Sequence, residues 1–177
     1  FDVDAFGADF AYTVDGGMVG EFAYETFNAA EAKVRVQGLS VHPGTAKGVM
    51  INSILIAKDF INALPTDETP ATTEGYEGFY HLTNISGNVE ETVLTYIIRD
   101  FDNDGFAKRK QFVLDVASRL NAKHGTGTFE VQLRDQYPNM REKIEPAYHI
   151  VEIALKAIEA ASVEPVVKPV RGGTDGS

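Results

Sequence analysis

Apolar and polar side chains alternate along the stretch AEAKVRVQG, which spans residues 30–38. From position 32 to position 37, alanine and valine occupy the even positions, and lysine, arginine and glutamine occupy the odd ones. A period of two is that of an extended chain, whose successive side chains point to opposite faces. The pattern therefore predicts a strand with one buried face and one solvated face.

The next stretch, up to Pro65, changes to the helical period. Its apolar residues recur at intervals of four and three, as they do on the buried side of an amphipathic helix. These residues are Met50, Ile54, Ala57, Ile61 and Leu64. We expect the helix to begin at Pro43, with Ser40 or His42 near its cap, because proline fits the first helical position.

Two β-rich segments follow, separated by the turn residues SGN at positions 86–88. They predict a hairpin with arms at about residues 76–85 and 91–101. The second arm has apolar residues on both faces, as a central strand does. Residues 65–75, which precede the hairpin, have the composition of an exposed loop.

A second helix and a last strand complete the middle of the chain. The helix has Asp102 or Asn103 as its candidate N-cap and Gly125 beyond its end. Its predicted buried stripe consists of Phe106, Val113, Val116 and Leu120. The stretch TFEVQLRDQY then alternates with period two, and its inward residues are Phe129, Val131 and Leu133.

The resulting order of elements, β-α-β-β-α-β over residues 30–137, predicts a ferredoxin-like domain of the α+β class. We expect one antiparallel sheet with both helices on one face. The flanks, residues 1–29 and 138–177, contain further strand, loop and helix patterns, including a strand FAYTV at 10–14. They predict segments of a second, α/β domain that the middle interrupts.

The composition of the chain argues against some classes of partner and excludes one type of metal ligand. The net charge is −10 with scattered lysines and arginines, which disfavours nucleic acid as a partner. The chain has no cysteine, so a metal site must use Asp, Glu and His. It has no apolar run long enough for a bilayer and no signal-peptide pattern, so we expect a cytoplasmic protein without a membrane partner. Since it begins without Met and stops in a loop pattern, we also expect an internal fragment.

Four places in the chain carry candidate chemistry. Asp15 follows the predicted strand 10–14 and precedes two glycines, where it is either a turn residue or a ligand at a strand end. His42 is either an ordinary cap-region residue or a donor to a developing oxyanion. Arg141 either pairs with a neighbouring glutamate or holds a carboxylate with two hydrogen bonds. The loop RGGTDG at residues 171–176 offers backbone amides, a hydroxyl and a cation to an anionic ligand.

Seven ordered stretches of the chain resemble one family closely: DVDAFGADFAYTVDGG, ETFNAAEAKVRVQG, VHPGTAKGVMIN, EGYEGFYHL, YIIRDFD, DQYPNMREKIEP and VKPVRGGTDG. The family is that of the peptidase T enzymes, tripeptide aminopeptidases of the co-catalytic zinc peptidase superfamily. The resemblance implies a zinc-binding α/β catalytic domain interrupted by a lid or dimerisation domain. Residues 30–137 would be the lid, and residues 1–29 and 138–177 would belong to the catalytic domain.

The resemblance also implies a role for each candidate residue. Asp15 is similar to a zinc ligand, and His42 resembles the lid histidine that reaches the scissile carbonyl oxygen. Arg141 and the loop residues Arg171, Gly172, Gly173 and Thr174 resemble residues of the substrate cleft. The implied mechanism is attack of a hydroxide that bridges two zinc ions on the first peptide bond of a short peptide.

The family's other zinc ligands and its catalytic glutamate have no counterpart among these 177 residues. We therefore expect the chain alone to retain one zinc ligand and to be inactive. The alternative from another class is a ferredoxin-like interaction module without catalysis, which would form a homodimer through the lid. A third interpretation, a separate small-molecule-binding domain, leaves the flanks unexplained.

Overall fold

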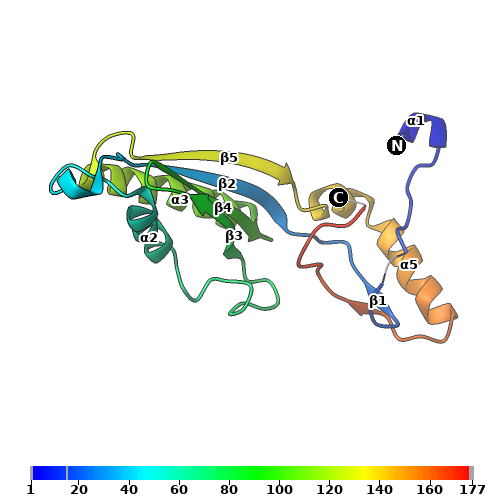
Figure 1. Ribbon diagram of the computed structural model, residues 1–177. Helices are drawn as coiled ribbons and strands as arrows, with labels where there is room; N and C mark the ends of the chain where they lie inside the picture. Colours follow the sequence, from blue (N-terminus) through cyan, green and yellow to red (C-terminus); the bar gives the residue numbers. More distant parts are fainter. Residues whose placement is uncertain (1, 15, 176–177) are drawn as a thin grey trace. The chain divides into compact units, whose positions relative to one another are not determined.

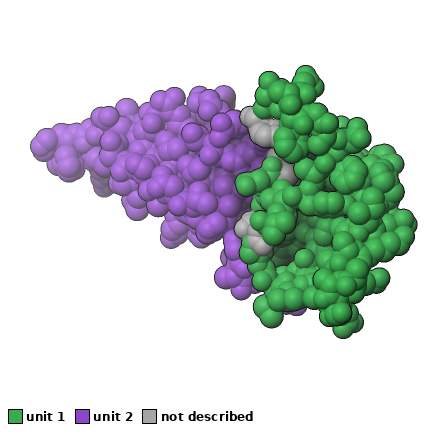
Figure 2. All heavy atoms as spheres, turned by 90° about the vertical axis from the view of Figure 1, so that its right-hand side faces the viewer, with its two compact units in different colours: residues 1–27, 138–177 green, residues 28–137 purple. Residues whose placement is uncertain are grey.

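The computed structural model describes residues 2–14 and 16–175. The chain divides into two compact units, which Figure 2 shows in purple and green. We call residues 28–137 the sheet unit, and residues 1–27 with 138–177 the flanking unit. No helix in the described residues is both long enough and apolar enough to cross a bilayer.

The sheet unit is a four-stranded sheet with two longer helices on one face (Figure 1). Its elements are β2 (Asn28–Gln37), η1 (Pro43–Thr45), α2 (Ser53–Ala63), β3 (Phe79–Gly87), β4 (Glu91–Asp100), α3 (Asn103–His124) and β5 (Phe129–Tyr137). The strands lie in the order β3-β4-β2-β5, and every neighbouring pair is antiparallel. This arrangement confirms the predicted ferredoxin-like, α+β fold class.

The core lies between the sheet and the two helices. The apolar residues at alternate positions of β2, from Ala32 to Val36, are fully buried there, as the sequence pattern predicts. Lys33 and Arg35 on the other face of the strand are exposed. The helices cover the buried side with Ala57 and Phe60 of α2, Leu64 just beyond its end, and Phe106, Val113 and Val116 of α3. Helix α3 begins as expected, because the carboxylate of Asp102 accepts the N–H of Gly105 at 2.6 Å.

The predicted start of the first helix is wrong. Helix α2 begins at Ser53, where the side chain of Asn52 accepts the N–H groups of Ile54 and Leu55. Pro43 opens only the three-residue 3₁₀ turn η1. The backbone of Ile51, the residue before the N-cap Asn52, pairs with that of Leu39 in an antiparallel bridge, and this bridge keeps Ile51 out of the helix. As a result Met50 precedes the helix, and Ile54 is 44% exposed.

The core contains one unsatisfied hydroxyl among the described residues, that of Tyr96 on β4. Burial of this side chain, which is 3% exposed, also raises the pKa of the phenol. We expect Tyr96→Phe to stabilise the chain by about 1 kcal/mol, because the variant no longer buries a polar group without a partner. Urea denaturation followed by circular dichroism measures the change, and a marked loss of stability would contradict it.

The flanking unit contains short elements: α1 (Val3–Phe6), β1 (Glu21–Phe22), α4 (Arg141–Ile144), η2 (Glu145–Ala147), α5 (His149–Ala160) and β6 (Val166–Val167). Strands β1 and β6 pair in parallel, and the bridge Thr26–Val170 continues this pairing. The predicted strand at residues 10–14 is wrong, since no strand among the described residues pairs with it. The hydroxyl of Tyr12 instead donates to the carbonyl oxygen of Ile150 at 2.6 Å.

Candidate functional site

His42 lies in the sheet unit, at the residue before η1. Its ring nitrogen Nδ1 accepts the backbone N–H of Gly44 at 3.1 Å, and its carbonyl oxygen accepts the N–H of Thr45 at 3.0 Å. Because Nδ1 accepts a hydrogen bond, the neutral ring carries its proton on Nε2. His42 is exposed, so its ring is accessible to a hydrogen-bond acceptor from outside the loop. The neutral ring can therefore donate a hydrogen bond through Nε2.

The loop that carries His42, residues 38–52, is fixed at both ends by backbone hydrogen bonds. At its start, the N–H of Gly38 donates to the carbonyl oxygen of Glu90 at 2.6 Å. Leu39 and Ile51 exchange two bonds of 2.8 and 3.0 Å, which close the loop. Beyond its end, the N–H of Ser53 donates to the carbonyl oxygen of Val89 at 3.0 Å. These bonds attach the histidine loop to the β3–β4 turn.

Arg141 lies in the flanking unit, at the start of α4. Its Nε donates to Glu145 at 2.5 Å, and its Nη1 lies 3.4 Å from a carboxylate oxygen of Glu25. The hydrogen bond to Glu145, together with the charge of Glu25, raises the pKa of Arg141 above its usual value. The guanidinium is therefore a fixed cation that remains 48% exposed. The predicted pairing with a neighbouring glutamate is confirmed at Glu145, and the binding of a substrate carboxylate stays a prediction.

Residues 24–27 connect Arg141 to the C-terminal loop within the flanking unit. On one side, the amide oxygen of Asn139 accepts the N–H groups of Thr26 at 3.1 Å and of Arg141 at 3.0 Å. On the other side, the N–H of Phe27 donates to the carbonyl oxygen of Gly172 at 3.3 Å, and the guanidinium of Arg171 lies 5.2 Å from the centre of the Phe27 ring. Gly173 and Thr174 continue this loop. The fold thus brings the two candidate substrate segments to the same four residues, 24–27.

Sequence reasoning missed Glu25 and Asn139, which position Arg141. Both are nearly buried, at 6% exposure each. Asn139 has a local signal, since an asparagine side chain often accepts the backbone N–H of the residue two positions further on. Glu25 has none, because its contact with Arg141 spans 116 positions of the chain.

The expected metal ligand Asp15 lies outside the described residues. Within residues 2–14 and 16–175, no group of three or more His, Asp or Glu side chains could hold a metal ion.

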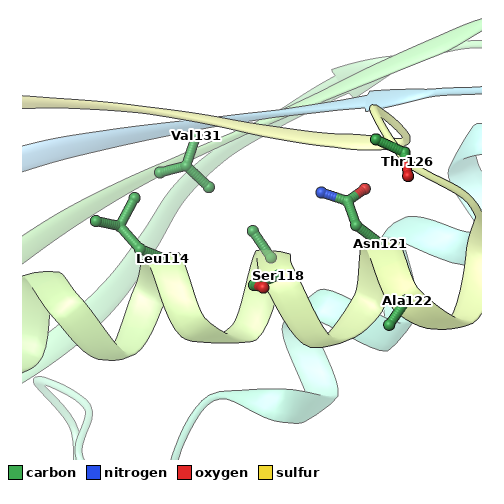
Figure 3. A pocket seen from close by; sticks show the side chains of 7 residues that line it. Leu114, Ser118, Asn121, Ala122, Thr126 and Val131 are labelled. Atoms are coloured by element: carbon green, nitrogen blue, oxygen red, sulfur yellow. The ribbon is translucent and has the colours of Figure 1, made fainter.

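A shallow hollow of about 520 Å³ lies between α3 and β5 in the sheet unit (Figure 3). It is lined by Leu114, Ala117, Ser118, Asn121, Ala122, Thr126 and Val131. None of these side chains ionises, and the amide of Asn121 is engaged by the backbone of Phe129 through two bonds of 2.8 Å. The hollow lacks the groups that acid–base or metal chemistry requires.

Two proteins whose sequences are similar to this chain are both named Peptidase T. The Peptidase T of Desulfitobacterium hafniense (strain DSM 10664 / DCB-2) is 63% identical over all 177 residues, and the Peptidase T of Clostridium perfringens (strain SM101 / Type A) is 59% identical. The chain spans 43% and 44% of the length of these two relatives.

Among solved structures, aminopeptidase PepT from Bacillus cereus matches with a TM-score of 0.79 at 20% identity, covering 99% of this chain and 47% of that one. A tripeptidase from Staphylococcus aureus matches with a TM-score of 0.81 at 21% identity, covering 100% and 47%. These structural matches show a shared fold.

The family described as "Peptidase dimerisation domain" matches residues 24–128, which include β2, η1, α2, β3, β4 and α3. This match extends over more than half of the chain. The chain therefore belongs to the peptidase dimerisation domain family.

Proposed function

We propose that this chain is part of a zinc-dependent tripeptide aminopeptidase, which removes the N-terminal residue from tripeptides. The sheet unit would be its lid, and the flanking unit would belong to its catalytic domain. The observation that carries the proposal is the 63% identity to a Peptidase T, which extends through the flanks as well as the sheet unit. We place the enzyme in the cytoplasm and expect a homodimer through the lid.

The proposed role of His42 is to donate a hydrogen bond from Nε2 to the carbonyl oxygen of the scissile peptide bond. Negative charge develops on this oxygen when the carbonyl carbon is attacked, and a fixed donor stabilises that charge most in the transition state. The bond from Gly44 to Nδ1 supports this role, because it fixes the proton on the other ring nitrogen.

Arg141 and residues 171–174 have a proposed role in binding the peptide. Arg141 would bind the peptide carboxylate, and the loop would supply backbone N–H groups and the Thr174 hydroxyl. Zinc in the intact site would supply a hydroxide at neutral pH by lowering the pKa of bound water towards ~7. Asp15 is the proposed ligand from this chain, and the other ligands and the general base belong to other parts of the enzyme.

The decisive experiment is steady-state kinetics of the intact enzyme with a tripeptide. We expect His42→Ala to lower kcat by roughly 100-fold or more with little change in KM, as does the loss of an oxyanion donor. The matched control is His81→Ala, which removes an exposed imidazole from another part of the same unit and leaves kcat unchanged. Equal kinetics for His42→Ala and the wild type would refute the assigned role.

The alternative is an interaction module without catalysis, and the description of the family that matches residues 24–128 supports it for that part of the chain. The two proposals differ for the intact enzyme, which hydrolyses tripeptides only under the first. For the isolated 177-residue chain we propose no hydrolysis. Release of an N-terminal residue by the purified chain with added zinc would show that this is wrong.

A further inference from the structure

We propose that two buried hydroxyl groups, those of Ser53 and Thr92, are positioning groups that hold the histidine loop, residues 38–52, in place for catalysis. We assign neither residue a contact with the substrate, since both act through His42. The inference rests on the role proposed above for His42 and names the groups on which that role depends.

Three successive carbonyl groups of the β3–β4 turn accept hydrogen bonds from the two ends of the histidine loop. The carbonyl oxygen of Glu90 accepts the N–H of Gly38, at the start of the loop, at 2.6 Å. The carbonyl oxygen of Val89 accepts the N–H of Ser53, just beyond the end of the loop, at 3.0 Å. The carbonyl oxygen of Asn88 accepts the hydroxyl of Ser53 at 2.6 Å. Because one turn supplies all three acceptors, it fixes the two ends of the loop relative to each other.

The Ser53 hydroxyl has a single proton, and this determines the direction of its second hydrogen bond. The proton is directed to the carbonyl oxygen of Asn88. The Ser53 oxygen also lies 2.7 Å from the hydroxyl oxygen of Thr92, so Thr92 is the donor in that pair. The hydrogen bonds therefore run in one direction, from Thr92 to Ser53 and from Ser53 to the turn.

Both hydroxyl groups are shielded from water. Ser53 is 0% exposed and Thr92 is 1% exposed. When a buried polar group loses its partner, water cannot take the partner's place, and the group remains unsatisfied. Removal of the Ser53 hydroxyl would leave both Thr92 and the carbonyl group of Asn88 without this partner. The turn and the loop could then recover hydrogen bonds only by moving.

The surroundings of the hydroxyl pair are built from regular elements. Ser53 is the first residue of α2, and Thr92 lies on β4 between Val36 of β2 and Gly87 of β3. Glycine at position 87 leaves room for the hydroxyl, because a Cβ there would lie 2.5 Å from Oγ1 of Thr92. Helices and strands hold a group more precisely than loops do. The pair therefore connects the histidine loop to the rigid part of the sheet unit.

The hydrogen bonds of His42 itself fix its ring only within the loop. Its ring accepts the N–H of Gly44 and its carbonyl oxygen accepts the N–H of Thr45, and both partners belong to the same loop. The position of the ring relative to the sheet thus depends on the ends of the loop. A displacement of about 1 Å can lower the rate of a catalysed reaction by roughly 100-fold. The bonds of Ser53 therefore affect how well His42 can reach an oxyanion.

The competing explanation is that the hydroxyl pair only stabilises the sheet unit. Thr92 offers two variants that separate the explanations. Thr92→Val retains the volume and removes the hydroxyl, whereas Thr92→Ser retains the hydroxyl and removes a buried methyl group. Positioning predicts that kcat of the folded enzyme falls for valine and not for serine. A stabilising role alone predicts that kcat is unchanged for both.

The test is steady-state kinetics of the intact enzyme with a tripeptide. We expect Ser53→Ala to lower kcat about 10-fold with KM unchanged, and Thr92→Val to lower it roughly 3-fold. The double variant should be no slower than Ser53→Ala, because both changes interrupt the same chain of bonds. The matched control is Ser118→Ala, which removes an exposed serine hydroxyl from α3 of the same unit and leaves kcat unchanged.

A second cycle tests whether Ser53 acts through His42. In the His42→Ala enzyme, Ser53→Ala should cause no further loss of kcat, and a further loss would overturn the inference. Hydrogen exchange measured by mass spectrometry gives a readout that does not depend on activity. We expect the peptide covering residues 38–52 to exchange about 10-fold faster in Ser53→Ala and at the wild-type rate in Ser118→Ala.

The outcomes distinguish this inference from the proposed function. A normal kcat for Ser53→Ala beside an impaired His42→Ala would refute the positioning role alone. Wild-type exchange of residues 38–52 in Ser53→Ala would also refute it, because the loop would then not depend on the hydroxyl. Normal kinetics for His42→Ala would instead refute the proposed role of His42 and, with it, any positioning of that residue.

Discussion

Replacing Gly38 with alanine is expected to destabilise the sheet unit by roughly 2–3 kcal/mol, the cost of forcing an extra methyl group into closely packed surroundings. A Cβ at this position would collide with the carbonyl oxygen of Val89, and would lie 2.5 Å from that of Ile51 and 2.9 Å from the nitrogen of Ser53. All three atoms belong to the backbone, so no side-chain rotation relieves the contact. Urea denaturation of the purified chain measures the loss.

The same substitution should also lower kcat of the intact enzyme, because Gly38 is the point where the His42 loop leaves β2. Gly48→Ala is the matched control, since it lies in the same loop with open space around it and a φ of +75°. Its expected cost is about 1 kcal/mol, from left-handed backbone strain alone. A loss at Gly38 no larger than the loss at Gly48 would show that the collision is relieved by movement of the loop.

Removing Arg109 is expected to have the largest effect on stability, a loss of about 3–5 kcal/mol for Arg109→Ala, as for other broken buried ion pairs. The Arg109 side chain is 17% exposed, and its Nε binds Asp100 at 2.7 Å while its Nη1 binds Glu68. Its guanidinium also lies 5.2 Å from the centre of the Tyr80 ring, a residue whose pKa burial raises to about 12. Alanine would leave the carboxylate of Asp100, 11% exposed, without its cation.

Arg35→Ala is the control for this prediction. Arg35 also pairs with a carboxylate, that of Glu91, but the two side chains are 57% and 37% exposed. Exposed pairs contribute roughly 0–1 kcal/mol, so the two variants should differ clearly in their midpoints of thermal unfolding. Similar midpoints would indicate that the Arg109 cluster is as weak as a surface pair.

The sequence predicts the sheet unit well because its buried positions follow the periods of two and 3.6 residues that local geometry imposes. It fails where a contact between distant residues decides the structure. The bridge between Leu39 and Ile51 delays the start of α2 to Ser53, and no local sequence pattern indicates this bridge. Residues 10–14 have the composition of a strand, yet strand formation also requires a partner, which composition does not reveal.

In the candidate site, too, local sequence patterns predict some features, and contacts between distant residues decide the others. The position of His42 before a proline indicates a turn, but which ring nitrogen carries the proton depends on the hydrogen bond from the N–H of Gly44. The sequence suggested a nearby glutamate for Arg141, and Glu145 is one of its partners. Its other partner, Glu25, comes from the opposite end of the chain and could be found only from the fold.

The carbonyl oxygen of Glu68, which accepts the N–H of Tyr80 at 2.9 Å, protects part of the outer edge of β3 from pairing with foreign strands. A sheet edge open along its whole length permits several registers, and sliding between them leads towards irregular aggregates. By bonding to the first half of β3, the loop before it shortens the stretch of edge with which another strand could pair. A shorter edge admits fewer registers, so the loop acts against irregular aggregation of the folded chain.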